Sequence, residues 1–330
     1  MPLPHGRRRR FGRHPDGELL MGIVRYIFAR VLRVLIVVGG LIVVVFFLTR
    51  AFTNPVDVIL GPDSSAAQRA RLNAQLGFDQ PLIEQFFTYV KGLMRGDLGE
   101  SLSLDRPAID AIVERLPASL VLATCSVGLA VIVGLALGIA GGLKPGSIYD
   151  RLTIAVTSLS VAVPDFWLGL MFISIFSVNL GWFPTGGYDG LTEPKYWVLP
   201  AVTLALLPTG RLARVVRESI AEEMSRDYVV AARSRGMGTA SIVRRHVLKN
   251  ISVATSTVIT FDFLLLFAGF GASLEVVYSW PGIGRLAIQA TLASDIVLVS
   301  ALVIVTGLIV GIGNVLLDVV HVLIDRRIST

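Results

Sequence analysis

Long apolar stretches alternate with shorter polar ones along most of the chain. Six of them come near the length of about 20 apolar residues that a helix needs to cross a bilayer: residues 30–52, 116–143, 152–178, 196–216, 251–274 and 296–317. Pro164 and Asp165 interrupt the third stretch, and Asp262 is the single charge in the fifth. The pattern predicts an all-α integral membrane protein with six transmembrane helices.

Basic residues cluster at one set of ends of these stretches. They occupy an N-terminal arm over residues 1–29, the loop after the second stretch, the segment after the fourth and the C-terminal tail. With six spans, all of these regions lie on the same side, and loops rich in Lys and Arg stay in the cytosol. We therefore expect the arm and both termini in the cytosol, and a six-span membrane domain over residues 30–330 that contacts lipid.

The polar segment over residues 53–112 then lies on the extracytoplasmic side. Its sequence predicts two amphipathic helices, one over Ala66–Leu76 and another that begins at Pro81. The second carries an apolar stripe at helical spacing, which is typical of packing against the membrane domain; contact with a partner protein is the alternative. The stripe consists of Ile83, Phe86, Phe87, Val90 and Leu93.

Composition narrows the function. Hydrophobic residues make up 53% of the chain and charged residues 16%, against about 25% charged residues in soluble domains. The formal net charge is +6 and lies beside apolar stretches, which favours lipid over nucleic acid as the partner of the basic groups. Cys125 is the one cysteine and the histidines lack ligand spacing, so we predict neither an intrachain disulfide nor a metal site.

The sequence contains no pattern that indicates catalysis. It lacks the G-x-x-x-x-G-K-[S/T] loop that cradles ATP phosphates, and its local sequence suggests no pairing of a nucleophile with a base. We therefore predict no catalytic residue and no cofactor in this chain. If ATP drives its activity, another subunit must bind the nucleotide.

The most informative polar segment covers residues 218–250, between the fourth and fifth stretches. It contains the run D-Y-V-V-A-A-R-S-R-G-M-G, which starts at Asp227. Ser225 can cap a short helix that has Asp227 in its first turn, and Gly236 can end it. Thr239 can cap a second short helix. Two helices joined by a Gly-x-Gly bend suit close contact with a partner; a solvated basic loop is the alternative.

The candidate contact residues combine paired alanines, which let a partner approach closely, with flanking arginines, which supply charge. They are Asp227, Tyr228, Ala231, Ala232, Arg233, Arg235, Gly236, Met237 and Gly238.

This segment resembles the EAA loop of ABC importer permeases, in which Ala231, Ala232 and Gly236 hold matching positions. Val230 stands where that pattern has Glu, and Lys249 where many members have Pro. The resemblance extends over residues 27–329 to the B-type permease of dipeptide, oligopeptide and nickel importers. It is carried by LGFDQP at 76–81, RGDLGES at 95–101, ERLPAS at 114–119, PDFWLG at 164–169 and PGIGR at 281–285.

The resemblance implies a type I ABC importer permease fold in a bacterial plasma (inner) membrane, with an extracytoplasmic excursion after the first helix. It implies that this chain and a homologous second permease subunit form a pathway, that two ATP-binding subunits hold ATP and Mg²⁺, and that an extracytoplasmic substrate-binding protein delivers the substrate. The expected substrates are di- or oligopeptides; nickel complexes, glutathione or sugars are alternatives. An ion-coupled secondary carrier is less favoured, because it usually has paired halves with broken helices.

Asp165 and Asp262 are candidates for the translocation pathway. A carboxylate at membrane depth costs about 2.5–3.5 kcal/mol on insertion scales, so each should face protein or water. Each could simply accept a hydrogen bond from a neighbouring helix. Alternatively, at least one faces the pathway and favours cationic groups, such as the amino terminus of a peptide. Pro164 supports the second interpretation for Asp165, because it frees a backbone carbonyl nearby.

Overall fold

The computed structural model describes residues 15–52, 56, 60, 64–77, 79–190 and 193–324. Helices dominate it, with one two-stranded antiparallel hairpin. In chain order the elements are α1 (Pro15–Phe52), α3 (Ala66–Leu76), α4 (Leu82–Leu93), β1 (Glu100–Ser101), β2 (Arg106–Pro107), α5 (Ala108–Leu143), α6 (Ile148–Ala162), α7 (Asp165–Phe172), α8 (Pro194–Glu223), α9 (Asp227–Ser234), α10 (Thr239–Ile242), α11 (Leu248–Leu265), α12 (Ala272–Val277), α13 (Ile283–Leu292) and α14 (Ile296–Ile324). Wider π-helical turns follow α7, α10 and α11, at Ile173–Asn179, Val243–Val247 and Leu266–Phe270.

Within the described residues, five helical stretches are long and apolar enough to cross a membrane. They are Phe28–Arg50, Ala108–Leu143, Pro194–Glu223, Thr239–Phe270 and Ile296–Val319, and they contain or overlap five of the six predicted spans. The helix of the first begins at Pro15, inside the predicted arm of residues 1–29. Residues 1–14 and 325–330, which include both termini, lie outside the described residues.

The third predicted span consists of two helices rather than one. The pair Ile148–Ala162 and Asp165–Asn179 bends by 102° and gives a sixth candidate span only if both halves are counted together. Val163, between them, is extended, with φ −98° and ψ 121°. A residue that precedes proline is driven out of the helical region by the proline ring, so Pro164 ends α6 and restarts the chain as α7 in a new direction.

Small residues allow the long helices to pack closely. Gly134, Gly138 and Gly142 recur every four residues on α5 and face α8. A Cβ atom on Gly138 would come within 2.7 Å of Val216, so a larger residue there would separate the two helices. Such a line of small residues is a common way for membrane helices to approach one another.

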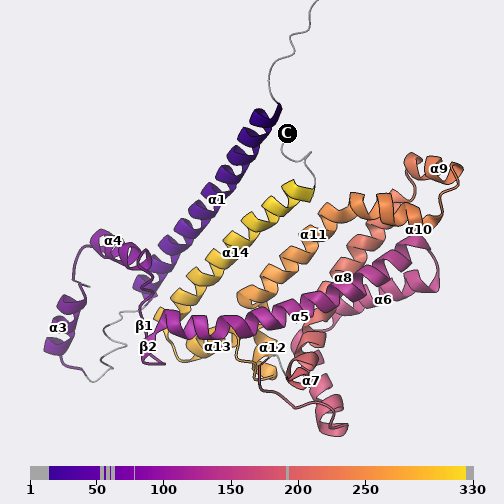
Figure 1. The fold of residues 1–330 in the computed structure, drawn as a ribbon. Helices are drawn as coiled ribbons and strands as arrows, with labels where there is room; N and C mark the ends of the chain where they lie inside the picture. The colour runs from indigo at the N-terminus through magenta and orange to yellow at the C-terminus, as the bar shows by residue number, and fades with distance from the viewer. Residues whose placement is uncertain are drawn as a thin grey trace, which may run out of the picture.

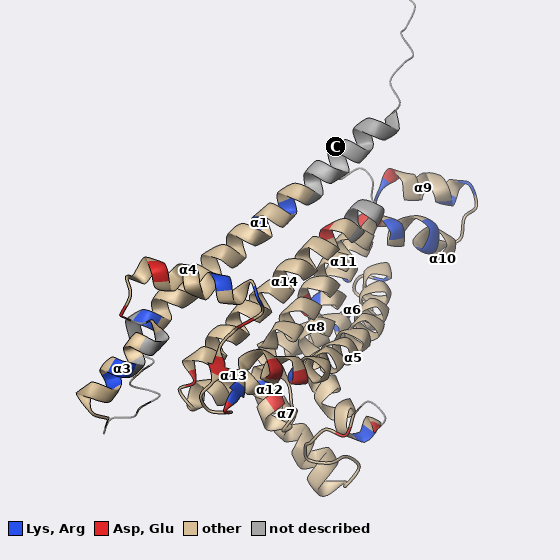
Figure 2. Ribbon diagram, turned by 60° about the vertical axis from the view of Figure 1, so that its left-hand side comes forward, with Lys and Arg blue, Asp and Glu red and all other residues tan. Residues whose placement is uncertain are grey.

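The two ends of the helix bundle differ. The first part of α1, the last part of α14 and α9 lie at one end, and α4 and the β1–β2 hairpin lie at the other (Figure 1). Lys and Arg residues occur on α9, in the bend after it and in the π-helical turn that follows α10 (Figure 2). The segments that we predicted to be cytosolic and extracytoplasmic are thus separated in space.

The segment that we predicted to be extracytoplasmic contains both predicted helices. α3 has the predicted bounds, because Ser65 and Gln68 form a capping box and Gly77 ends the helix with φ +70°. α4 packs on α1 through Phe86, whose ring centroid lies 5.3 Å from that of Phe46. Ile83 and Phe87 of the predicted stripe are 60% and 65% exposed, so only part of that stripe packs against the membrane helices.

A buried carboxylate ties the hairpin to the start of α14. Asp295 accepts hydrogen bonds from Ser101 Oγ at 2.6 Å, from Ser103 N at 2.9 Å and Oγ at 2.8 Å, and from Leu298 N at 3.0 Å. Burial opposes ionisation of this carboxyl, but the four hydrogen bonds outweigh it and hold the pKa of Asp295 below its usual value. The RGDLGES stretch, which ends at Ser101, therefore has a structural role in holding the β1–β2 hairpin on α14.

Candidate coupling surface and central cavity

The helix predicted at Asp227 is present as α9, but a different residue precedes it. Arg226 is the N-cap and makes no side-chain capping bond, while Ser225 Oγ donates to Glu222 O at 2.7 Å and so belongs to the end of α8. The predicted stop is confirmed. Gly236 has φ +81°, a left-handed conformation that strains any residue with a Cβ atom, and Met237 N donates to Ala232 O at 3.2 Å.

The second predicted helix is not a separate short one. Gly238 is its N-cap in place of Thr239, and a helical stretch continues from Thr239 to Phe270. The sequence between residues 239 and 268 contains no Gly and no Pro. Lys249 stands where the resembling loops have Pro, so nothing interrupts the hydrogen bonds of the helix there. The helix that follows the Gly-x-Gly bend therefore continues directly into the fifth predicted span.

α9 has an inner and an outer face. Val229 and Ala232 are buried in a cluster with Ile242 and Val247, so the paired alanines do not share one surface: Ala231 is exposed and Ala232 packs inside the chain. The outer face is formed by residues three and four apart, which lie on one side of a helix: Asp227, Val230, Ala231 and Ser234, all exposed. Arg233, Arg235, Gly236 and Gly238 are exposed too, and Tyr228 and Met237 are half-buried.

A polar network fixes α9 to the membrane helices. Glu223 Oε2, at the end of α8, accepts a hydrogen bond from Tyr228 Oη at 2.6 Å and another from Asn250 Nδ2, on α11, at 2.8 Å. Burial and the bond to Glu223 raise the pKa of Tyr228 to about 12, so its hydroxyl stays protonated and can donate. The network joins three helices, α8, α9 and α11, at the base of the loop.

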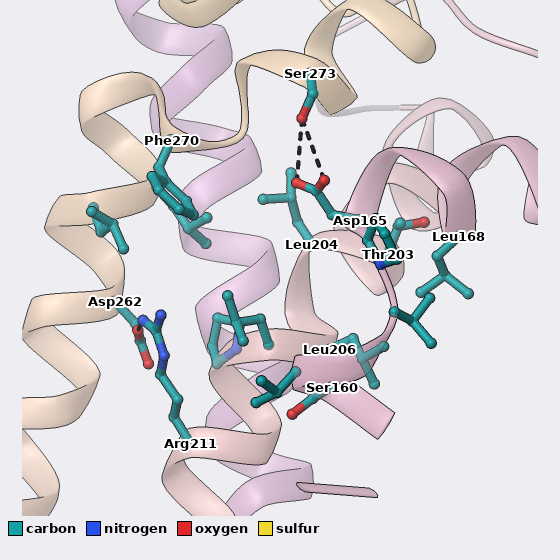
Figure 3. Close-up of a pocket in the computed structure, with 17 residues that line it drawn as sticks. Ser160, Asp165, Leu168, Thr203, Leu204, Leu206, Arg211, Asp262, Phe270 and Ser273 are labelled. Carbon is teal, nitrogen blue, oxygen red and sulfur yellow. Dashed lines mark hydrogen bonds and ion pairs between the residues drawn. The ribbon is translucent and has the colours of Figure 1, made fainter. Parts of the chain in front are cut away.

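A central cavity of about 470 Å³ lies where the break between α6 and α7 faces α8 and the end of α11. Both predicted pathway carboxylates line it, together with Arg211 of α8 (Figure 3). Asp262 is 2% exposed and Arg211 Nη1 lies 2.7 Å from its Oδ1. Asp165 accepts a hydrogen bond from Ser273 Oγ at 3.3 Å. Leucine side chains and Phe270 form much of the remaining wall.

Comparison with known protein families shows the family to which this chain belongs. A family model described as "Binding-protein-dependent transport system inner membrane component" matches residues 130–330, and the model of the N-terminal part of such membrane components matches residues 22–123. The chain belongs to this family. It is therefore a multi-pass component of a bacterial inner-membrane transport system.

Several proteins are similar to this permease. One from Brucella abortus (strain 2308), named as a peptide transport system permease, is 35% identical over 280 residues, which are 83% of this chain and 89% of that relative. The glutathione transport system permease protein GsiC of Escherichia coli (strain K12) is 31% identical over 93% of this chain and 99% of its own length. A solved inward facing structure of the MetNI methionine ABC transporter aligns with a TM-score of 0.49 at 20% identity, over 63% of this chain and 95% of that chain.

The two carboxylates in the cavity of this permease differ in whether a basic side chain pairs with them. The Asp262 carboxylate is compensated by Arg211, whereas no Lys, Arg or His in the described part of the chain pairs with Asp165. Both carboxylates bond to a side chain of a neighbouring helix, and both line the same cavity. A role of either carboxylate in the translocation pathway stays a prediction. In the described residues no group of three or more His, Cys, Asp or Glu could hold a metal ion.

Two site residues were not recognised from the sequence. Arg211 lies near the end of the fourth apolar stretch, where topology rules take an arginine as a cytosolic charge, although α8 continues for twelve more residues, to Glu223. Val230 was read only as a departure from the EAA pattern, yet it is 57% exposed on the outer face of α9. Val230 lies three residues after Asp227 and four before Ser234, which places all three on one face of a helix. This spacing is the sequence signal that could have identified Val230.

A second buried carboxylate explains the PGIGR stretch. Glu275 accepts hydrogen bonds from Ser119 Oγ at 3.1 Å and from Arg285 N at 2.8 Å. The carboxylate lies so near Gly282 that a Cβ atom there would collide with it. The ERLPAS and PGIGR stretches, far apart in sequence, therefore meet at Glu275.

Proposed function

We propose that this permease forms half of the translocation pathway of an ATP-driven ABC importer for di- or oligopeptides. The observation that carries the proposal is its 35% identity to a peptide transport permease over most of both chains. The uncompensated carboxylate of Asp165 in the central cavity supports it, because a peptide brings a free ammonium group. Nickel complexes and sugars are alternatives; the peptide and glutathione permeases to which the chain is similar favour peptides.

Glutathione is a second candidate, favoured by the similarity to GsiC over 99% of that protein. Glutathione is itself a peptide and has a free amino group, but it carries more carboxylates than amines. An uncompensated negative charge in the cavity would favour less acidic peptides.

The proposed complex contains a homologous second permease subunit, two ATP-binding subunits and an extracytoplasmic substrate-binding protein. In this proposal the permease is not catalytic, and the ATP-binding subunits hold ATP and Mg²⁺ and contact the outer face of α9. The test is purification of the tagged permease in detergent, followed by reconstitution and ATP-dependent peptide uptake. Co-purification of two ATP-binding polypeptides and peptide uptake are expected. A permease that purifies alone and transports on an ion gradient would be a secondary carrier.

The orientation proposed for this complex places α9 in the cytosol and α3 outside. After Cys125 is replaced, a cysteine near Gln68, at the exposed residue Ala67, should react with an impermeant thiol reagent in intact cells. A cysteine at exposed Ser234 should react only after the cells are opened. The opposite labelling pattern would reverse the proposed topology.

Asp165 is proposed to contact the amino terminus of the peptide. Asp165→Asn keeps the shape and the bond from Ser273 but removes the charge, so uptake of a free peptide should fall about tenfold, the effect of one charge-assisted hydrogen bond. Uptake of the same peptide with an acetylated amino terminus should change little. Asp79→Asn, at an exposed carboxylate outside the cavity, is the control. An equal loss for both peptides would make the role of Asp165 structural.

A further inference from the structure

A groove of about 500 Å³ runs between α1 and α14, on the side of the bundle away from the central cavity. The two helices approach closely beside it, because a Cβ atom on Gly307 would collide with Leu41 and one on Gly311 would lie 2.6 Å from Val34. The walls of the groove are mostly apolar. They include Val34, Val37, Val38, Leu41, Val303, Val310 and Val315.

Polar groups line one end of this groove. Arg30 and Asp318, which bridge the two helices at 3.0 Å, mark that end. Arg33 and Asn314 come next along the groove. Arg33 directly precedes the charge-free run of residues 34–49 on α1, and Asn314 lies four residues before Asp318 on α14.

Arg33 is the unusual member of this group. Its side chain is exposed, and among the residues that the structure describes no hydrogen bond or ion pair to it is found. An arginine beside the apolar run of a membrane helix is attracted to anionic head groups. The Arg33 guanidinium can donate two parallel hydrogen bonds to a phosphate, and Asn314 is exposed beside it.

We infer that the groove between α1 and α14 binds an anionic phospholipid, with its phosphate on Arg33 and an acyl chain along the valines. Basic pockets between transmembrane helices commonly hold anionic head groups, and the charge of the site matches. A helix of a partner protein fits less well, because a helix is about 10 Å across, whereas a single acyl chain is much narrower. The proposed lipid binding does not depend on the proposed transport function. The orientation proposed above would place the bound phosphate in the cytosolic leaflet.

The test uses the purified transporter complex in micelles that contain equal amounts of palmitoyl-oleoyl phosphatidylglycerol and phosphatidylcholine. Native mass spectrometry measures how much of each lipid the complex retains. The wild type should retain more phosphatidylglycerol than phosphatidylcholine. Arg33→Gln should reduce that preference about fivefold, the effect of one basic group near an anionic lipid, and Arg33→Lys should keep most of it. Arg151→Gln, at an exposed arginine on α6 outside the groove, should leave the preference unchanged.

Val303→Phe gives an independent test of the acyl-chain site. Val303 lines the groove and is 38% exposed, so the larger ring should fill the groove and lower the retention of both lipids without touching Arg33. A photoreactive benzoyl-phenylalanine at Val37 should cross-link to lipid in membranes. No lipid preference in the wild type, an unchanged preference in Arg33→Gln, or a cross-link from Val37 to the second permease would overturn the inference.

Discussion

Arg211→Gln is expected to destabilise the permease by about 3 kcal/mol or more, the largest loss of stability that we predict for one side chain. The substitution leaves the carboxylate of Asp262 without the guanidinium that lies 2.7 Å from it. Asp262 is 2% exposed, so water cannot replace the lost partner well. Removing one member of a buried ion pair typically costs about 3–5 kcal/mol, because a buried charge is left uncompensated.

The double variant Arg211→Gln with Asp262→Asn should recover most of that loss. Two amides can hydrogen-bond to each other, and no charge is then left without a partner. The measurement is the midpoint of thermal unfolding of the purified complex in detergent, compared as a double-mutant cycle. Asp165→Asn, in the same cavity, is the control, because it leaves no charge unpaired. If Arg211→Gln is as stable as the wild type, or if the two substitutions are additive, the pair does not stabilise the fold.

The double variant also separates structure from transport. A variant that unfolds like the wild type but transports slowly would show that the charges of the pair act in the pathway. Equal stability and equal transport would leave the pair with a purely structural role.

Local signals made parts of this fold predictable. α3 begins and ends where the sequence predicts, because Ser65, Gln68 and Gly77 fix its ends by bonds within a few residues. The turn at Gly236 was predictable for the same reason. Pro164 revealed that the third apolar stretch is interrupted, but the 102° bend is set by how α6 and α7 pack on other helices.

The parts that could not be predicted depend on distant partners. Asp262 and Arg211 are 51 residues apart, and rules for topology count an arginine near the end of an apolar stretch as a cytosolic charge. Ala232 and Ala231 are equivalent in the sequence pattern, and only the packing of α9 on Ile242 and Val247 shows that one is buried. The sequence predicts which helix carries each candidate residue. Whether that residue faces the interior or the outside depends on contacts between helices.

Ala231→Trp should abolish the coupling of transport to ATP hydrolysis while leaving the permease folded. Ala231 is exposed on the outer face of α9, between Asp227 and Ser234, so an indole ring there is accommodated by solvent in the isolated chain. In the proposed complex the same ring would hold an ATP-binding subunit away from α9. Residues at the centre of an interface often contribute about 2 kcal/mol or more, so the substrate-stimulated ATPase rate should fall at least about tenfold.

The design of this experiment follows from the two faces of α9. Ala232→Trp is uninformative about docking, because its side chain is 2% exposed and the ring would disrupt the inner cluster. Gly236→Trp is also unsuitable, since φ of +81° strains any larger residue. The matched control is Ala67→Trp, the same substitution at an exposed position of α3, at the opposite end of the molecule. ATP hydrolysis and uptake are measured in the reconstituted complex, with the amount of bound ATPase subunit as a second readout. Normal stimulation and full subunit binding in Ala231→Trp would place the docking surface elsewhere, because no partner could approach α9 closely past an indole ring at the middle of its outer face.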